Sequence, residues 1–143
     1  MTPCAQVLES LGLEYDFFIT SAHRTPERTK ELVVSEEAKG CQVFICAAGM
    51  AAHLAGVVAS YTMRPVIGIP LASQALGGMD ALLSTVQMPS GYPVATVAIG
   101  GAKNAAWLAA QIIALNDPDL QEKIKVARRE MQQAVISKSL VKK

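Results

Sequence analysis

The sequence predicts an α/β domain in three layers, with a parallel β-sheet between helices. Three observations predict this class. Short β-rich runs alternate with helical segments along the chain, and the junctions carry turn residues. Some β-rich runs are continuously apolar, as in strands that are covered on both faces. At 143 residues, with no repeat, linker or low-complexity segment, residues 1–143 are expected to form one domain with its own core.

The N-terminal segments begin this alternation. Thr2-Pro3 places a capping residue before a proline, which favours a helix start, and Gly12 favours its end. A strand is predicted at Glu14–Ile19. Doubly wound domains usually begin with a strand and a phosphate-binding loop. Because this chain begins with a helix, we expect the first strand of the sheet to be missing.

A second helix and a second strand follow. Thr25-Pro26 repeats the capping signature and opens a charged helix that runs to Lys39 and closes at Gly40. Gln42–Ala47 is a nearly uninterrupted apolar run of strand length, which predicts a buried strand.

The second half of the chain continues the same pattern. We expect helices and strands in turn at Ala51–Tyr61, Val66–Pro70, Met79–Val86, Val94–Ile99 and Lys103–Leu115.

The last helix is predicted at 117–141, opened by Asp117-Pro118. Its apolar side chains fall on one narrow stripe, formed by Leu120, Ile124, Ala127, Met131 and Val135. We expect this helix to pack on a neighbouring subunit.

Charge is scarce and unevenly distributed. Charged residues make up 17% of the chain, against about 25% in ordinary soluble domains. Between Cys41 and Ile113 the charged residues are Arg64, Asp80 and Lys103. A segment this poor in charge makes an unsuitable surface for a small monomer, so we expect it to be buried, in part against other copies of the chain. The net charge of +1 argues against nucleic-acid binding.

Several other classes are excluded by pattern. The apolar runs are of strand length, shorter than the ~20 residues of a membrane-spanning helix, and the N-terminus lacks a signal-peptide pattern. Cys4, Cys41 and Cys46 are odd in number and lack CxxC spacing, which predicts reduced thiols in a cytoplasmic protein. With two histidines and no ligand cluster, we expect no metal site.

Candidate site residues follow the predicted strands, because ligands of open parallel sheets bind beyond the carboxyl ends of the strands. Ser21-Ala22-His23-Arg24 joins a hydroxyl, an imidazole and a guanidinium at a helix N-terminus, which suits a phosphate or a carboxylate. The bland alternative is a local cap by Ser21, a packed His23 and an Arg24 paired with a glutamate.

A second candidate follows the Gln42–Ala47 strand. Ala48, Gly49, Met50 and Ala52 keep the backbone open to a planar ligand, and His53 stands at the start of the next helix. A histidine that merely packs on an alanine-rich helix is an equally good interpretation. For the loops Leu71–Gly78 and Met88–Pro93, ordinary turn chemistry is the favoured interpretation, and a site lined by Ser73, Gln74 and Gly77-Gly78 is the alternative. In Gly100–Asn104, helix capping explains Asn104.

These motifs together carry a resemblance. The chain is similar to the catalytic subunit of phosphoribosylaminoimidazole carboxylase, the bacterial-type 5-(carboxyamino)imidazole ribonucleotide mutase family of purine biosynthesis. The matching blocks cover nearly the whole chain in order: Ser21–Pro26, Ala48–Gly56, Ser84–Pro89, and Pro93–Ile99 followed by Asn104-Ala105.

The resemblance implies a flavodoxin-like fold, a homo-octamer with active sites at subunit junctions, and no cofactor or metal. It implies a carboxylate shift from the exocyclic nitrogen of a nucleotide substrate to ring carbon C4. His23 would be the general acid and base, Ser21 and Arg24 would hold the phosphate, and Ala22 would line the site. The Ala48–Ala52 backbone would face the aminoimidazole ring, with His53 nearby. Functional coupling to the ATP-dependent synthase that makes the substrate is a further expectation.

One feature departs from the family pattern and leaves alternatives open. The Gly-Ser-x-Ser-Asp loop that normally follows the first strand is absent. A non-catalytic assembly or ligand-binding protein is therefore one alternative. Direct carboxylation of aminoimidazole ribonucleotide by carbon dioxide is another, although that sister group usually carries Arg-Ser-Asn where this chain has Met50-Ala51-Ala52-His53.

Overall fold

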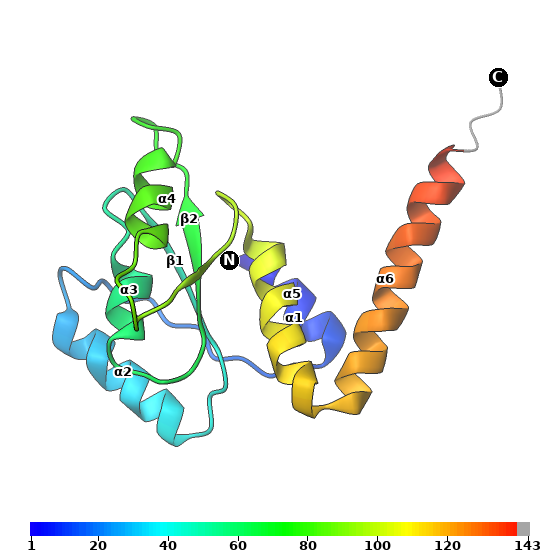
Figure 1. Cartoon of the computed structure of the whole chain (residues 1–143), viewed down its shortest axis with the longest axis horizontal. Helices are drawn as coiled ribbons and strands as arrows, with labels where there is room; N and C mark the ends of the chain where they lie inside the picture. Colours follow the sequence, from blue (N-terminus) through cyan, green and yellow to red (C-terminus); the bar gives the residue numbers. More distant parts are fainter. Residues whose placement is uncertain (140–143) are drawn as a thin grey trace.

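The computed structural model describes residues 1–139, which fold into helices arranged around a small sheet (Figure 1). In chain order the elements are α1 (Thr2–Leu11), α2 (Pro26–Ala38), β1 (Phe44–Gly49), α3 (Leu54–Ala59), β2 (Val66–Leu71), α4 (Met79–Val86), β3 (Ala95–Thr96), α5 (Ala102–Ile113), the short 3₁₀ helix η1 (Ala114–Asn116) and α6 (Pro118–Ser139).

The described strands form one parallel sheet in the order β1-β2-β3, so β1 lies at an edge. In the register between β1 and β2, Ile45 is opposite Ile67 and Ala47 is opposite Ile69. Since side chains alternate across a strand, these isoleucines share one face of the sheet, while Cys46 and its neighbours occupy the other.

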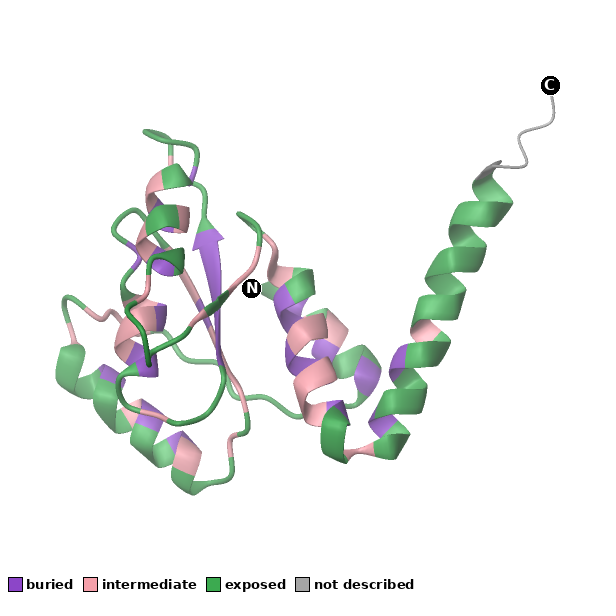
Figure 2. Cartoon of the chain, in the orientation of Figure 1, coloured by how far each residue is buried: buried purple, intermediate pink, exposed green. Residues whose placement is uncertain are grey.

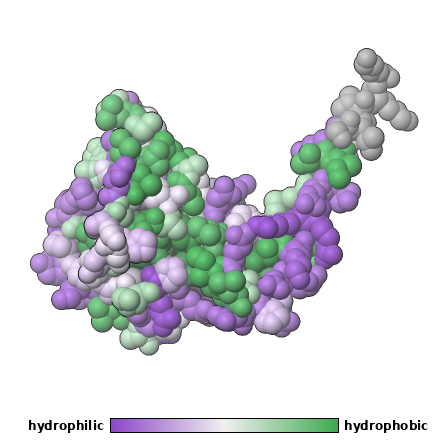
Figure 3. Space-filling view, in the orientation of Figure 1, coloured by the Kyte–Doolittle hydropathy of each residue, from purple (hydrophilic) through white to green (hydrophobic). Residues whose placement is uncertain are grey.

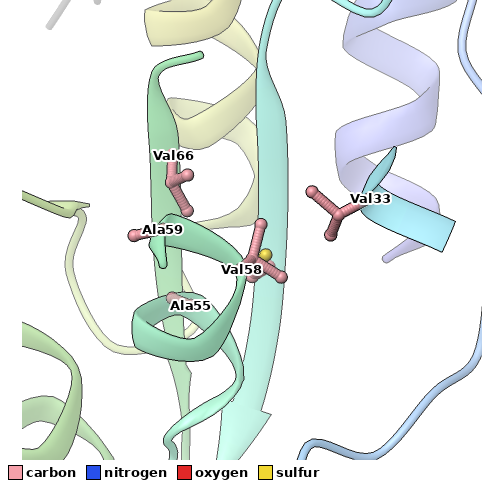
Figure 4. Packing of buried hydrophobic residues seen from close by; sticks show 6 residues of the cluster. Val33, Ala55, Val58, Ala59 and Val66 are labelled. Carbon is pink, nitrogen blue, oxygen red and sulfur yellow. The ribbon is translucent and has the colours of Figure 1, made fainter. Parts of the chain in front are cut away.

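Helices α2 and α3 cover the face that carries Cys46. Val33 of α2 and Ala55 and Val58 of α3 belong to one buried cluster with Cys46 and Val66. Figure 4 shows Val33 pointing toward Val58. The small residues of α3 bring that helix close to the sheet. This close packing leaves no room for charged side chains, which explains why α3 has none.

Helices α1 and α5 cover the opposite face. Ala105 and Ala109 of α5 pack on Ile67 and Ile69, and α1 contributes Cys4 and Leu8 to a cluster with Ala106. The sheet therefore lies between two helical layers, as predicted, and the most completely buried residues follow β2 and the inner side of α5 (Figure 2).

Helix α4 approaches β2 at a glycine. A Cβ atom on Gly68 would overlap the side-chain methyl group of Thr85, and it would also meet Val94 at 3.0 Å. Thr85 is itself buried, and its hydroxyl donates to the carbonyl of Ala81 at 2.7 Å. The glycine in β2 is what lets α4 lie against the strand.

The predicted strand at Glu14–Ile19 is wrong. These residues are extended but form no strand, because a strand needs a neighbour for its backbone hydrogen bonds and the described sheet ends at β1. The apolar side chains of this segment are left on the surface, with Phe17 60% and Ile19 83% exposed.

The capping predictions are confirmed at two helices. Thr25 is the N-cap of α2 and Pro26 its first residue, and the Asp117 carboxylate accepts the amide of Leu120 at 2.9 Å at the start of α6. At α1 the N-cap is Met1, so Thr2 already lies inside the helix.

Helix α6 packs on the body only near its start. Leu120 and Ile124 are buried in a cluster with Leu11, Ala110 and Ala114, whereas Met131 and Val135 on the same stripe are exposed and the helix extends away from the sheet (Figures 1 and 2). Residues 140 and 141 of the predicted helix lie outside the described residues. Within residues 1–139, no helix combines the length and apolarity needed to cross a membrane.

Candidate active site

The turn before α2 carries the first group of predicted site residues. The amide of Arg24 donates to Ser21 Oγ at 3.2 Å, and its guanidinium Nε donates to the same oxygen at 3.4 Å. The side chains of His23 and Arg24 are exposed, while Ser21 and Ala22 are half-buried. One hydroxyl thus anchors a guanidinium that faces solvent, an arrangement able to bind an anion.

The turn after β1 carries the second group. Gly49 ends the strand opposite Leu71 of β2, and Met50 adopts a positive φ of 55°, unusual for a residue other than glycine. The amides of Ala52 and His53 donate back to the carbonyls of Met50 and Ala51, at 2.9 and 2.8 Å. This tight backbone folds Ala52 inward and leaves the His53 ring on the surface.

The two turns meet through their histidines. His23 Nε2 lies 3.2 Å from His53 Nδ1, and the rings pack edge to face with centroids 5.2 Å apart. His53 Nδ1 also lies 3.1 Å from the carbonyl oxygen of Ala51. Residues 30 positions apart in the sequence thus form one exposed pair.

Two further loops end at the same edge of the sheet. The amide of Gly100 donates to the carbonyl of Pro70 at the end of β2, and Gly78 lies against Ile99. Ser73 donates to the Asp80 carboxylate at 3.3 Å. A surface hollow of about 310 Å³ lies away from these turns, between α5 and α6, and is lined by Trp107, Arg128 and Met131.

The cysteines show no sign of nucleophilic activation. Burial raises the pKa of Cys46 to about 12, and burial is also the main cause that raises the pKa of Cys4 and of Cys41. A thiol with a raised pKa stays protonated and inert near neutral pH. Among the described residues, no group of three or more His, Cys, Asp or Glu side chains is placed to hold a metal ion.

The structure also reveals a threonine cluster that the sequence analysis missed. Thr20, Thr25 and the fully buried Thr29 connect through their hydroxyls directly beneath the Ser21–Arg24 turn. The available signal was the spacing of Thr25 and Thr29, which are four residues apart and therefore on one face of a helix.

Comparison with known proteins identifies the family of the chain. Residues 1–134 match the family described as AIR carboxylase. The chain belongs to the AIR carboxylase family. A relative from Pyrococcus abyssi, named N5-carboxyaminoimidazole ribonucleotide mutase, is 53% identical over 92% of this chain and 75% of its own length. A relative of the same name from Saccharolobus solfataricus is 49% identical over 98% of this chain and 89% of its own.

The fold of this AIR carboxylase family member also agrees with solved structures. The crystal structure of Treponema denticola PurE superposes with a TM-score of 0.89 at 31% identity, covering 99% of this chain and 89% of that one. The expected three-layer, flavodoxin-like architecture is consistent with this match.

Proposed function

We propose that this chain is an N5-carboxyaminoimidazole ribonucleotide mutase of purine biosynthesis, a cofactor-independent isomerase. The observation that carries the proposal is the exposed His23, set between Ser21 and Arg24 and in contact with His53. Curated relatives with this name, about half identical over nearly the whole chain, support it.

The chemistry needs one group that both gives and takes a proton. His23 donates a proton to the exocyclic nitrogen as the N–C bond of the carbamate breaks and carbon dioxide leaves. Ring carbon C4 then forms a bond to the same carbon dioxide, and His23 removes the C4 proton, which restores both the ring and the catalyst. An imidazole suits this double role near neutral pH.

The remaining site residues bind and orient the substrate. Arg24, held by Ser21 Oγ, pairs with the phosphate group, and Ala22 lines the same turn. The backbone of Ala48, Gly49, Met50 and Ala52 faces the aminoimidazole ring.

Assembly completes the site in this proposal. The histidine pair lies on an exposed surface, and chemistry of this kind requires water to be excluded from the carbon dioxide intermediate. A second copy covering the site in a cytoplasmic homo-octamer supplies that exclusion. Apolar surface over α4 (Figure 3), where Met79, Leu83 and Val86 are about half exposed, supports the assembly.

The assignment of His23 is tested by exchanging each histidine for asparagine. We expect His23→Asn to lower kcat at least about 100-fold, the size of a general acid–base contribution, while substrate binding measured by calorimetry persists. His53→Asn should lose less, because His53 only contacts the proton-transferring ring. Near-normal turnover in His23→Asn, or a larger loss in His53→Asn, would contradict the assignment.

The choice of substrate is tested separately. The purified chain should consume N5-carboxyaminoimidazole ribonucleotide without added bicarbonate. If the chain instead consumes aminoimidazole ribonucleotide in the presence of bicarbonate, and does not consume N5-carboxyaminoimidazole ribonucleotide, it is a direct carboxylase. Adding the ATP-dependent synthase should raise the flux of the coupled reaction, as expected if the two enzymes act in sequence.

A further inference from the structure

The threonine cluster beneath the candidate site has a defined hydrogen-bond direction. Thr29 Oγ1 donates to the carbonyl of Thr25 at 3.0 Å, and Thr25 Oγ1 donates to the carbonyl of Ser21 at 3.0 Å. Each hydroxyl has one proton. With both of these protons given to carbonyls, Thr20 is the donor in its 2.8 Å contact with Thr29, and its single proton also faces Thr25 Oγ1 at 3.2 Å.

This chain of bonds ends on the turn that carries His23. Thr25 Oγ1 accepts the amide of Ser21 at 3.1 Å, and the amide of Thr25 donates to the carbonyl of Ser21 at 2.8 Å. The Thr25 hydroxyl thus holds the amide and carbonyl of Ser21, and the carbonyl of Thr25 in turn accepts the hydroxyl of Thr29 in α2. Thr29 is 1% exposed, so its hydroxyl has no water to replace a lost partner.

We propose that Thr29, acting with Thr20, is a positioning residue for the reaction: it fixes the Ser21–Arg24 turn and so sets where His23 and Arg24 meet the substrate. The inference rests on the proposed function, because it assigns Thr29 a role in serving that site. Thr29 itself lies inside α2 and touches no reacting group.

The position of Thr29 favours this role over simple packing. A threonine inside a helix can satisfy its hydroxyl as a donor to the carbonyl four residues back, as Thr85 does with Ala81 in α4, where its other contact at 3.5 Å is also with a carbonyl, that of Ala52. Thr29 makes the same bond and accepts a second one from Thr20, a residue outside the helix. The second bond joins the helix to the turn.

The test removes hydroxyls without changing side-chain size. In Thr29→Val we expect kcat/KM to fall about tenfold, the worth of one buried hydrogen bond, with kcat lowered through His23 and KM raised through Arg24. Thr29→Ser should restore both, since serine keeps the hydroxyl. Thr62→Val is the matched control, because it removes a threonine hydroxyl that donates to Glu37 near the other end of α2, and it should leave both constants unchanged.

A readout independent of turnover separates this inference from the proposed function. Hydrogen exchange of the Ser21, Arg24 and Thr25 amides, followed by mass spectrometry at a temperature where circular dichroism shows every variant folded, should quicken in Thr29→Val alone. If neither the wild-type chain nor any variant turns over the substrate, but hydrogen exchange changes as described, the proposed function is wrong and Thr29 still positions the turn.

Clear results would overturn the inference. Wild-type exchange and wild-type kcat/KM in Thr29→Val would do so, as would a Thr29→Ser variant that is as defective as Thr29→Val. If Thr29→Val does not fold, Thr20→Val removes the same bond from the side of Thr20, together with the 3.2 Å contact between Thr20 and Thr25. A double variant that loses the sum of the two single effects would show that the hydroxyls act independently, which the inference excludes.

Discussion

At the scale of single residues, the contact between His23 and His53 restricts where each ring keeps its proton. A carbonyl oxygen only accepts, so the 3.1 Å contact with Ala51 requires a proton on His53 Nδ1. His23 Nε2, at 3.2 Å from the same nitrogen, is then the acceptor. In this arrangement His23 Nε2 accepts a hydrogen bond from His53, so His23 must gain a proton and give up that bond before it acts as the general acid of the first proposed step.

Ser21 offers a prediction at the same scale. Ser21→Ala removes the oxygen that accepts both donors of Arg24, so the guanidinium loses its anchor. We expect KM to rise about tenfold, the effect of losing a hydrogen bond to a charged group, with a smaller change in kcat. Steady-state kinetics check this, with Ser10→Ala as the control, since Ser10 is an exposed serine of α1 that donates only to Val7. An unchanged KM would contradict the proposal that Arg24 binds the substrate.

At the scale of elements, the close approach of α4 to β2 links packing to the site. Thr85 of α4 lies within 3.5 Å of the carbonyl of Ala52, so a shift of this helix reaches the turn that carries His53. The glycine of β2 is the residue that allows the approach.

Gly68→Ala tests this link. The added methyl group has no room beside Thr85 and Val94, and overpacking of a filled core costs about 1–3 kcal/mol of unfolding free energy. Urea denaturation should show that loss. Gly40→Ala is an unsuitable control, because Gly40 has a φ of 100°, which alanine rarely adopts. The control is Ala48→Gly in β1, which changes the backbone entropy of a strand without adding volume. A fully stable Gly68→Ala variant would mean that α4 can move off the strand at no cost.

Most elements could be predicted from the sequence because their signals are local. Proline after a capping residue marked α2, and Asp117-Pro118 marked α6. The segment Glu14–Ile19 could not, because strand formation depends on a neighbour elsewhere in the chain and its composition gives no information about that neighbour. The approach of His23 to His53 was not predicted, because it depends on how two separate turns meet, and the Thr20–Thr29 bond depends on how the turn folds back on α2.

At the scale of the whole molecule, the shortage of charge between Cys41 and Ile113 has two parts. Much of it is internal: the sheet and the alanines of α5 are buried within the chain itself. The rest is external, since the exposed side of α4 shows apolar side chains that nothing in residues 1–139 covers. The internal part follows from the fold, and the external part supports association between copies.

Association is a measurable expectation. Sedimentation of the purified chain at micromolar concentration should give a particle of roughly 120 kDa, eight times the 15.1 kDa chain. Val135→Glu, on the exposed stripe of α6, should shift the distribution to smaller species, because burying an unpaired charge in an interface is costly. Gln133→Glu, on another side of the same helix, should leave it unchanged. A stable wild-type monomer would contradict the prediction.

The extended segment between α1 and α2 has a consequence for handling the protein. Phe17, Phe18 and Ile19 are exposed on consecutive positions, and strand β1, which pairs with β2 on one side, has no partner strand on its other side within the described residues. Exposed apolar residues and a free strand edge are the features that promote β-type aggregation. Glu14 and Asp16 interrupt the segment with negative charge, which opposes stacking of one copy on another. Solubility during expression should therefore depend on these two carboxylates far more than on the charges of α6.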